Sequence, residues 1–267
     1  KHKNFKSTKN KVWCAGLPHS GSTLMEEIFE LLPYVRLDQS FLRYFSKFNI
    51  THLHGISNES FLCFPNDKFS FLKTHSHFEQ EFIEFAKDCD ISIIVCLRDL
   101  RDMMLSRYWH IMSNKNHQAH LIVKDLPFKE GFIKTLLLPN EENFYSDKPI
   151  NDYFLWIKNW LLEEKKGNIK LFWYEDYIRN PIKYLDDIKE FIEFKNIDSS
   201  FLEEKLEEKR IKYMQTPLEK RLFNKSRSKS TYRSGRVGEW KKHFDDDIIK
   251  IINDNIDGKI EEITRNQ

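Results

Sequence analysis

The chain has 267 residues, a formal net charge of +2 and 40% hydrophobic residues. This is the composition of one large globular domain with a buried core, so it excludes a disordered chain. No apolar run approaches the roughly 20 residues that span a bilayer, and the small net charge gives no indication of a nucleic-acid partner. We therefore expect neither a membrane nor a nucleic acid as a partner. Cys14 and Cys96 lie in apolar runs without C-x-x-C spacing, which predicts buried free thiols and a cytoplasmic location.

Short apolar segments alternate with segments of helical periodicity, which predicts an α/β fold with a parallel sheet covered on both faces by helices. The expected strands are residues 12–17, 69–72, 91–97 and 169–174. The expected helices are residues 23–32, a helix after the third strand that carries Met103, Met104 and Tyr108, and residues 151–166, 184–194, 201–213 and 246–263. Residues 113–149 have weak periodicity, and we expect them to form a long excursion over the functional site. We expect residues 1–11 to be a flexible basic tail and residues 12–267 to form one domain.

A phosphate-binding loop is indicated between the first strand and the first helix. The sequence from Gly16 to Thr23, GLPHSGST, keeps the glycines and the threonine of the motif G-x-x-x-x-G-K-[ST], but Ser22 replaces the lysine that contacts the β- and γ-phosphates. The free N–H groups at the start of a helix bind anions. The loop therefore suits a nucleotide whose reactive group is not a γ-phosphate. Taken alone, it is equally compatible with an ordinary glycine-containing turn.

Polar residues follow the second and third strands. Lys73 and His75 are two residues apart at a strand end and project to the same side. A histidine there could accept a proton from a hydroxyl, and a lysine could neutralise negative charge on a transferring group. Arg98 ends the third strand and Ser106 lies two turns into the next helix, where a guanidinium and a hydroxyl could bind phosphate. Each pair, taken alone, also fits a solvated strand end or helix start.

Two further motifs lie later in the chain. Tyr174 begins the sequence YED at the end of the fourth strand, where an aromatic ring could contact a purine or simply belong to the core. Residues 232–240, YRSGRVGEW, combine glycines and arginines without periodicity. Such a segment could wrap its backbone around a phosphate, or it could be a solvated basic loop.

In their joint order, the glycine loop, KTH, R-x7-S, YED and RSGRVGEW resemble the motifs of the cytosolic-type sulfotransferases over about residues 12–244. The resemblance implies an α/β fold, a single domain with a central parallel β-sheet flanked by helices, of the P-loop-NTPase-like sulfotransferase type. It implies 3′-phosphoadenosine-5′-phosphosulfate (PAPS) as the donor, with PAP as product and no metal. The sulfuryl group would pass in line to a hydroxyl or amine of a small-molecule acceptor.

The resemblance also implies roles for particular residues. His75 would be the general base, Lys73 would stabilise the sulfuryl group, and His19 stands where family members usually carry Lys or Arg beside the bridging oxygen. His19 could act as that cation only when protonated, which two phosphate-like groups would favour. The 5′-phosphate would lie on Ser20, Gly21, Ser22 and Thr23, next to Pro18 and His19. Leu24 stands where many members place a tryptophan against the adenine. The 3′-phosphate would lie on Arg98, Ser106 and Arg233, beside Gly235, and Tyr174 would contact the adenine, with Tyr232 and Ser234 nearby.

Other functions are compatible with parts of the sequence. A P-loop kinase or nucleotide hydrolase would bind Mg²⁺-ATP, and a catalytically idle PAPS-binding module would fit the replacement at His19. The pairs His52/His54 and His75/His77 could meet in a four-histidine metal site. The family's dimer motif, K-T-V-E, is not evident after Trp240, so we expect a monomer or a different dimer.

Overall fold

The computed structural model describes residues 11–32, 35–37, 69–75, 78–88, 90–137, 149–164, 168–194, 197–215 and 235–265. Its centre is a five-stranded parallel sheet with the strand order β2-β3-β1-β4-β5. The strands are β1 (Lys11–Gly16), β2 (Val35–Leu37), β3 (Phe69–Thr74), β4 (Ser92–Leu97) and β5 (Ile169–Trp173). The central strand β1 and its neighbour β4 are buried along almost their whole length, as their continuous apolar sequences predict. The expected α/β fold is confirmed.

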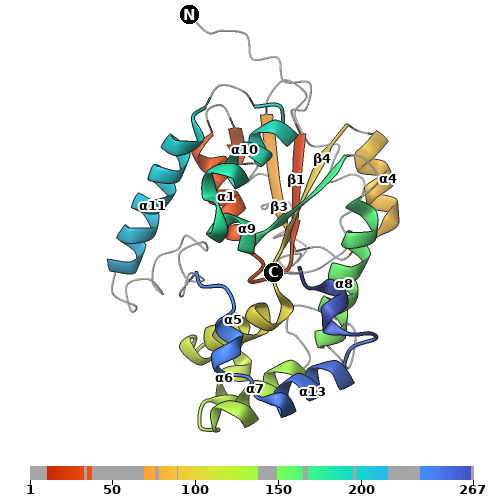
Figure 1. Cartoon of the computed structure of the whole chain (residues 1–267), viewed down its shortest axis with the longest axis vertical. Helices are drawn as coiled ribbons and strands as arrows, with labels where there is room; N and C mark the ends of the chain where they lie inside the picture. Colours follow the sequence, from red (N-terminus) through yellow and green to blue (C-terminus); the bar gives the residue numbers. More distant parts are fainter. Residues whose placement is uncertain are drawn as a thin grey trace, which may run out of the picture.

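Helices cover both faces of the sheet (Figure 1). One face carries α1 (Ser22–Leu31), α9 (Tyr174–Arg179), α10 (Pro181–Phe191) and α11 (Ser199–Gln215). The other carries α4 (Gln80–Asp88) and α8 (Pro149–Glu163). Two buried apolar clusters result, one on each face: Met25, Ile28 and Phe29 of α1 belong to the first, and Trp13 and Trp160 belong to the second.

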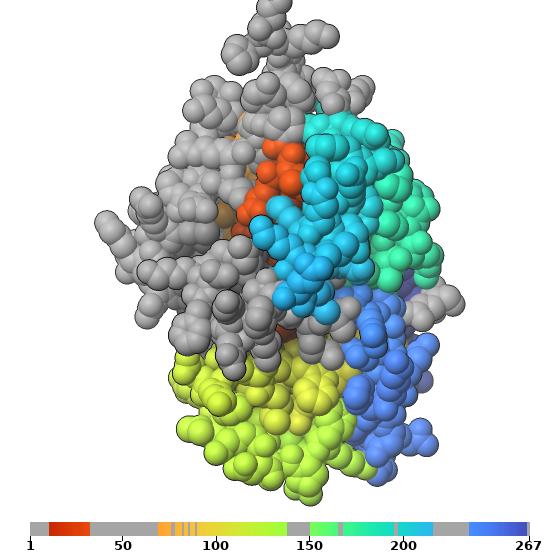
Figure 2. Space-filling view, turned by 90° about the vertical axis from the view of Figure 1, so that its left-hand side faces the viewer, coloured from red at the N-terminus to blue at the C-terminus, as the bar shows by residue number. Residues whose placement is uncertain are grey.

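A helical unit lies beyond the carboxyl ends of the strands, at the bottom of Figure 1. It consists of α5 (Leu100–Ser113), α6 (Gln118–Val123), α7 (Phe128–Leu137) and α13 (Asp246–Asp254). The short helices η3 (Glu239–Lys242) and η4 (Ile260–Ile263) flank α13. Figure 2 shows this unit beneath α11, with the C-terminal segment against its side. The unit therefore stands next to the sheet edge at which parallel α/β proteins bind ligands.

Two stretches differ from the sequence prediction. Residues 113–149 contain α6 and α7, which their weak periodicity did not predict. The reason is that α6 has only six residues, and the buried face of α7 includes Gly131 and Thr135, which do not register as apolar. Residues 246–263 are not one helix, because α13 ends at Asp254 and the chain turns before η4. Ile248 and Ile252 of α13 and Ile260 and Ile263 of η4 are buried, so a helix-like spacing continues across the break.

Three other elements were not expected from the sequence. They are β2, which is too short to give a pattern, α4, and the single-turn helix α9 that follows β5. In the described part of the chain, no helix combines the length and the apolar character needed to cross a membrane.

Candidate active site

The loop between β1 and α1 is a tight turn. Ser20 donates two hydrogen bonds to the carbonyl of Leu17, from its backbone N–H (3.2 Å) and from its hydroxyl (2.7 Å). Gly21 adopts a left-handed φ of 97° and is the N-cap of α1, so no side chain caps the first turn of this helix. A Cβ at Gly16 would lie 2.9 Å from the Cβ of Ser22. The loop thus presents the N–H groups of a helix start at the carboxyl edge of the sheet, which is a suitable place for an anion.

The KTH motif at the end of β3 separates its side chains as strand alternation predicts. Thr74 accepts a hydrogen bond from the indole N–H of Trp13 (2.8 Å), within the cluster under α8. Lys73 forms an ion pair with Glu26 of α1, on the other face of the sheet. The two flanking residues therefore reach the loop side, whereas Thr74 has a structural role.

His75 contacts the glycine loop directly. Its Nδ1 lies 2.5 Å from the backbone carbonyl oxygen of Gly16. Since a carbonyl can only accept, Nδ1 carries the hydrogen, and in the neutral ring Nε2 is then the nitrogen that can accept a proton. The contact places a histidine with a basic Nε2 at the mouth of the candidate phosphate loop.

Arg98 joins three parts of the site. It follows β4 and is buried, and its Nη2 donates to the carbonyl of Arg236 (2.9 Å) while Nη1 lies 3.4 Å from the carbonyl of His19. Its guanidinium carbon is 4.8 Å from the centre of the Tyr174 ring. Among the described residues, no acceptor lies within hydrogen-bond distance of its buried Nε. A buried guanidinium N–H without a partner is unfavourable, so this group is suited to an anionic ligand.

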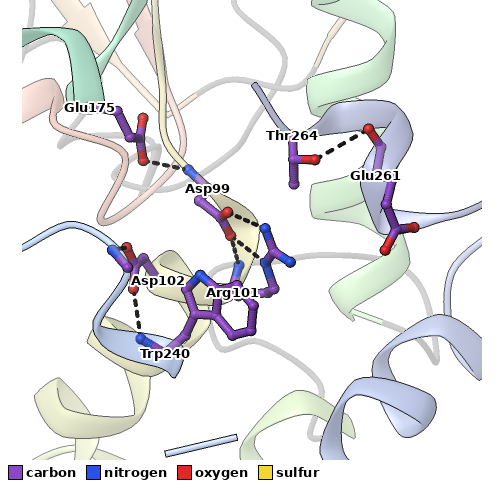
Figure 3. Close-up of polar contacts among 8 residues, drawn as sticks. Asp99, Arg101, Asp102, Glu175, Trp240, Glu261 and Thr264 are labelled. Atoms are coloured by element: carbon purple, nitrogen blue, oxygen red, sulfur yellow. Dashed lines mark hydrogen bonds and ion pairs between the residues drawn. The ribbon is translucent and has the colours of Figure 1, made fainter. Parts of the chain in front are cut away.

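The end of β4 is tied to α9 and to the start of α5 (Figure 3). Asp99 caps α5, accepting from the backbone N–H of Arg101 (2.8 Å), and its own N–H donates to Glu175 Oε1 (2.9 Å). Arg101 forms two further bonds to the Asp99 carboxylate and stacks on the Trp240 ring at 3.8 Å. Burial raises the pKa of Glu175. These bonds fix the backbone that carries Arg98.

Asp102 holds the C-terminal segment to α5 (Figure 3). Its carboxylate accepts from the N–H of Gly238 (2.6 Å) and from the N–H of Trp240 (3.0 Å). Burial raises the pKa of Asp102, and the two backbone donors and the nearby Arg98 oppose that rise. The segment from Gly235, with its left-handed φ of 63°, is thereby positioned over Arg98.

His19 is the departure from the usual family pattern, and it has a histidine beside it. Its backbone is left-handed (φ 69°), and its ring centre lies 5.5 Å from that of His110 on α5. His110 is in turn 6.2 Å from His117. Burial, with help from His110, holds the pKa of His19 well below its usual range, and burial also lowers the pKa of His110.

The structure brings most of the predicted residues to one edge of the sheet. Pro18 to Gly21 lie between β1 and α1, and Ser22 and Thr23 begin α1. Lys73 lies near the end of β3, and His75, Arg98 and Tyr174 come directly after β3, β4 and β5. Ser106 is half-buried on α5, and Leu24 packs partly against the core beneath α1.

Some predicted residues lie outside the described part of the chain, namely Tyr232, Arg233 and Ser234 of the donor set and His52, His54 and His77 of the metal hypothesis. Within the described ranges, no group of three or more metal-ligating side chains is assembled. The sequence did not indicate Glu26, Glu175, His110 or the role of Asp102. Each of these residues interacts with a residue that is distant in the sequence. Among the four, only Glu175 lies in a motif that the sequence analysis had singled out, the sequence YED.

A parallel sheet with a glycine loop, a histidine and a buried arginine at its carboxyl edge is typical of P-loop-like α/β proteins, which bind ligands at that edge. A family model, the sulfotransferase domain, matches residues 9–264. The chain therefore belongs to the sulfotransferase family, as the motifs predicted, and it is an enzyme of that class.

Individual relatives agree with this assignment. Flavonol 3-sulfotransferase of Flaveria bidentis is 24% identical over 291 residues, which cover 96% of this chain and 83% of that protein. The crystal structure of mouse sulfotransferase SULT7A1, complexed with PAP, superposes with a TM-score of 0.62 at 17% identity, over 90% of this chain and 80% of that one. Retinol dehydratase, solved with androsterone and the inactive cofactor PAP, gives a TM-score of 0.53 at 20% identity, over 92% and 80% of the two chains. The likeness to both structures confirms the fold.

Proposed function

We propose that this sulfotransferase uses PAPS as its donor and transfers the sulfuryl group to a hydroxyl or amine of a small molecule. The observation that carries the proposal is the contact between His75 Nδ1 and the carbonyl of Gly16, which supports His75 as the proton acceptor beside the donor loop. The PAP bound in the two solved relatives supports the choice of donor. Flavonol 3-sulfotransferase, retinol and androsterone in the names of relatives support a small-molecule acceptor.

The residues at the sheet edge fit such a donor. The uncapped N-terminus of α1 and the hydroxyls of Ser22 and Thr23 would hold the 5′-phosphate. The buried guanidinium of Arg98, whose Nε has no acceptor in the described structure, would hold the 3′-phosphate together with Ser106 and Arg233. Tyr174, which packs between Arg98 and Gly21, would contact the adenine.

PAPS supplies a sulfuryl group whose sulfur–oxygen bond to the 5′-phosphate breaks as a bond to the acceptor oxygen or nitrogen forms, and PAP leaves with the electron pair. His75 Nε2 accepts the proton of the acceptor hydroxyl or amine, and the hydrogen bond from Nδ1 to Gly16 keeps the ring in the required tautomer. The ammonium of Lys73 balances the negative charge of the group in transfer.

Glu26 controls the position of Lys73 in the free protein. The two side chains form an ion pair, and both are largely shielded from solvent. Lys73 is therefore held near the loop before a donor arrives, and an anion at the loop would compete with Glu26 for its charge. The ammonium of Lys73 is thus paired with Glu26 in the free protein and can turn to the anion when the donor binds.

Domain organisation and location are part of the same proposal. Residues 12–267 would form one sulfotransferase domain after a basic tail, and the enzyme would act as a monomer, or as a dimer without the K-T-V-E motif, in the cytoplasm. The buried thiols of Cys14 and Cys96, whose sulfurs lie 3.5 Å apart, support a reducing location.

The test is a calorimetric titration with PAP in EDTA, beside 5′-AMP and Mg²⁺-ATP. We expect metal-free binding of PAP that exceeds the binding of AMP. Arg98→Ala should weaken PAP binding by about 1.5–3 kcal/mol, or about ten- to a hundredfold, because it removes a charge-assisted bond. Arg179→Ala, a change at an exposed arginine on α9, is the matched control.

Three results would contradict the proposal or part of it. If Arg98→Ala lowers the affinities for AMP and for PAP equally, Arg98 does not bind the 3′-phosphate. Binding of Mg²⁺-ATP without any binding of PAP would favour a kinase-like function. Binding of PAP without transfer to any acceptor in a broad screen would favour the idle PAPS-binding module.

A further inference from the structure

The loop carries His19 where the resemblance places a cation, and both its burial and its basic neighbours oppose a proton on its ring. His19 sits in a left-handed turn, a conformation that most side chains avoid, and the adjacent Ser20 is bonded twice to Leu17. The conformation of the backbone therefore sets the direction of the His19 side chain. Such a strained position for a residue other than glycine suggests a functional demand on that side chain.

The groups around His19 are basic. The charged and titratable side chains that face it are His75 at the end of β3, Arg98 at the end of β4, and Arg107 and His110 on α5, with His117 behind His110. Arg107 is buried and donates to the carbonyl of Thr135 on α7, so it is held in place. Each of the facing groups opposes a proton on His19, and burial acts in the same direction.

An anion at the loop reverses this balance. A donor brings negative charge to the N-terminus of α1, next to His19, and an opposite charge within about 4–6 Å favours the charged form of a titratable group. The ring centres of His19 and His110 lie 5.5 Å apart, so a proton on one ring opposes a proton on the other, and the pair takes up one proton rather than two. His110 would act through His19 and is a positioning residue, not a catalytic one.

We propose that binding of the donor nucleotide draws one proton into the His19–His110 pair, which then supplies the positive charge beside the loop. The inference rests on the proposed function, because it requires a phosphorylated nucleotide at this loop. Its consequence is that donor affinity falls as the pH rises, by up to about tenfold per pH unit for one full proton, whereas a lysine at position 19 would carry its charge throughout. The enzyme would thus bind its donor best in mildly acidic solution.

The experiment is calorimetric titration of the full chain with PAP at pH 7 in PIPES, HEPES and Tris, whose ionisation enthalpies differ. The slope of the observed enthalpy against the buffer enthalpy counts the protons taken up. We expect a positive slope for the wild type and a clearly smaller one for His19→Lys and for His110→Phe. His75→Asn and His243→Gln are the controls that should keep the wild-type slope. Protonation of PAP itself is common to all variants, so the difference between variants isolates the pair.

The outcomes separate the two proposals. If the slope is the same in the wild type, His19→Lys and His110→Phe, the His19–His110 pair does not take up a proton when PAP binds. A slope lost in His75→Asn instead assigns the proton to His75 and also overturns the inference. If His19→Lys does not fold, a pH-independent PAP affinity of the wild type between pH 6 and 8 gives the same negative answer. Absence of any PAP binding by folded wild-type protein would instead reject the proposed function.

Discussion

Replacing Asp102 tests whether the C-terminal segment is held to α5 as the structure shows. Asp102 accepts hydrogen bonds from Gly238 (2.6 Å) and Trp240 (3.0 Å), and each bond to a charged group is worth about 1.5–3 kcal/mol. Gly238 and Trp240 are only half-buried, so water can satisfy their N–H groups once the carboxylate is gone. The raised pKa of Asp102 shows that its burial is itself unfavourable, which offsets part of the loss.

Two such bonds sum to about 3–6 kcal/mol, but Asp102→Ala also removes the unfavourable burial of the carboxylate, so we expect the free energy of unfolding to fall by about 2 kcal/mol. For a domain near this size, that corresponds to a fall of about 4–8 °C in melting temperature. Asp102→Asn should give an intermediate value, because its amide oxygen can accept one bond and its NH₂ group cannot accept the other. Differential scanning calorimetry of the three proteins measures the effect.

The control is Asp125→Ala, at a side chain that is 84% exposed and lies 3.5 Å from Lys124. A surface pair of this kind contributes little, so its loss should leave the melting temperature unchanged. If Asp102→Ala melts together with the wild type and with this control, the carboxylate does not hold the segment. A second readout is PAP affinity, which should fall in Asp102→Ala because the Arg236 carbonyl that orients Arg98 lies in the same segment.

Three further changes test the site. Gly16→Ala places a Cβ 2.9 Å from Ser22, so it should lower stability by about 1–3 kcal/mol in urea denaturation and abolish PAP binding; a variant that binds normally would show that the loop can relax. His75→Asn should abolish transfer from PAPS while leaving PAP affinity unchanged, and surviving transfer would remove His75 as the base. The lowered pKa values of His19 and His110 mean that the unfolded chain binds more protons, so stability should fall as the pH drops below about 6.5. The double variant His19→Gln/His110→Gln should flatten this slope in pH-dependent melting, and an unchanged slope would refute the assignment.

The sequence predicted the parts of the site that lie in continuous motifs. The glycine loop, KTH, Arg98 and Tyr174 each follow a strand, and parallel strands bring their carboxyl ends to one edge whatever the connections between them. The four expected strands are all present for the same reason, since continuous apolar runs bounded by polar turns form buried strands in such sheets. The spacing of the apolar residues and the order of the motifs along the chain were therefore enough to predict the strands and the edge of the sheet at which the site lies.

Contacts between distant segments could not be predicted in this way. From the sequence alone, Asp102 is expected only to interact favourably with the dipole of its helix. In the structure its carboxylate also accepts a hydrogen bond from Gly238, 136 residues away. Lys73 meets Glu26 because α1 packs over β3, and His110 meets His19 because α5 returns over the loop. None of these pairs has a characteristic spacing, so each depends on how helices pack after the sheet has formed.

The hydrogen bond between Arg98 and the carbonyl of Arg236 joins residues 138 positions apart, and this has a consequence for the order of synthesis. A growing polypeptide emerges from its N-terminus, so the glycine loop, His75 and Arg98 are all made long before the segment that covers them. A chain that ends before this segment lacks the carbonyl that orients Arg98, and it lacks the isoleucines of α13 and η4 that pack into the core against β1, β4 and β5. We therefore expect a nucleotide to bind only after residues 235–265 have been added, and we expect prematurely terminated chains not to bind it.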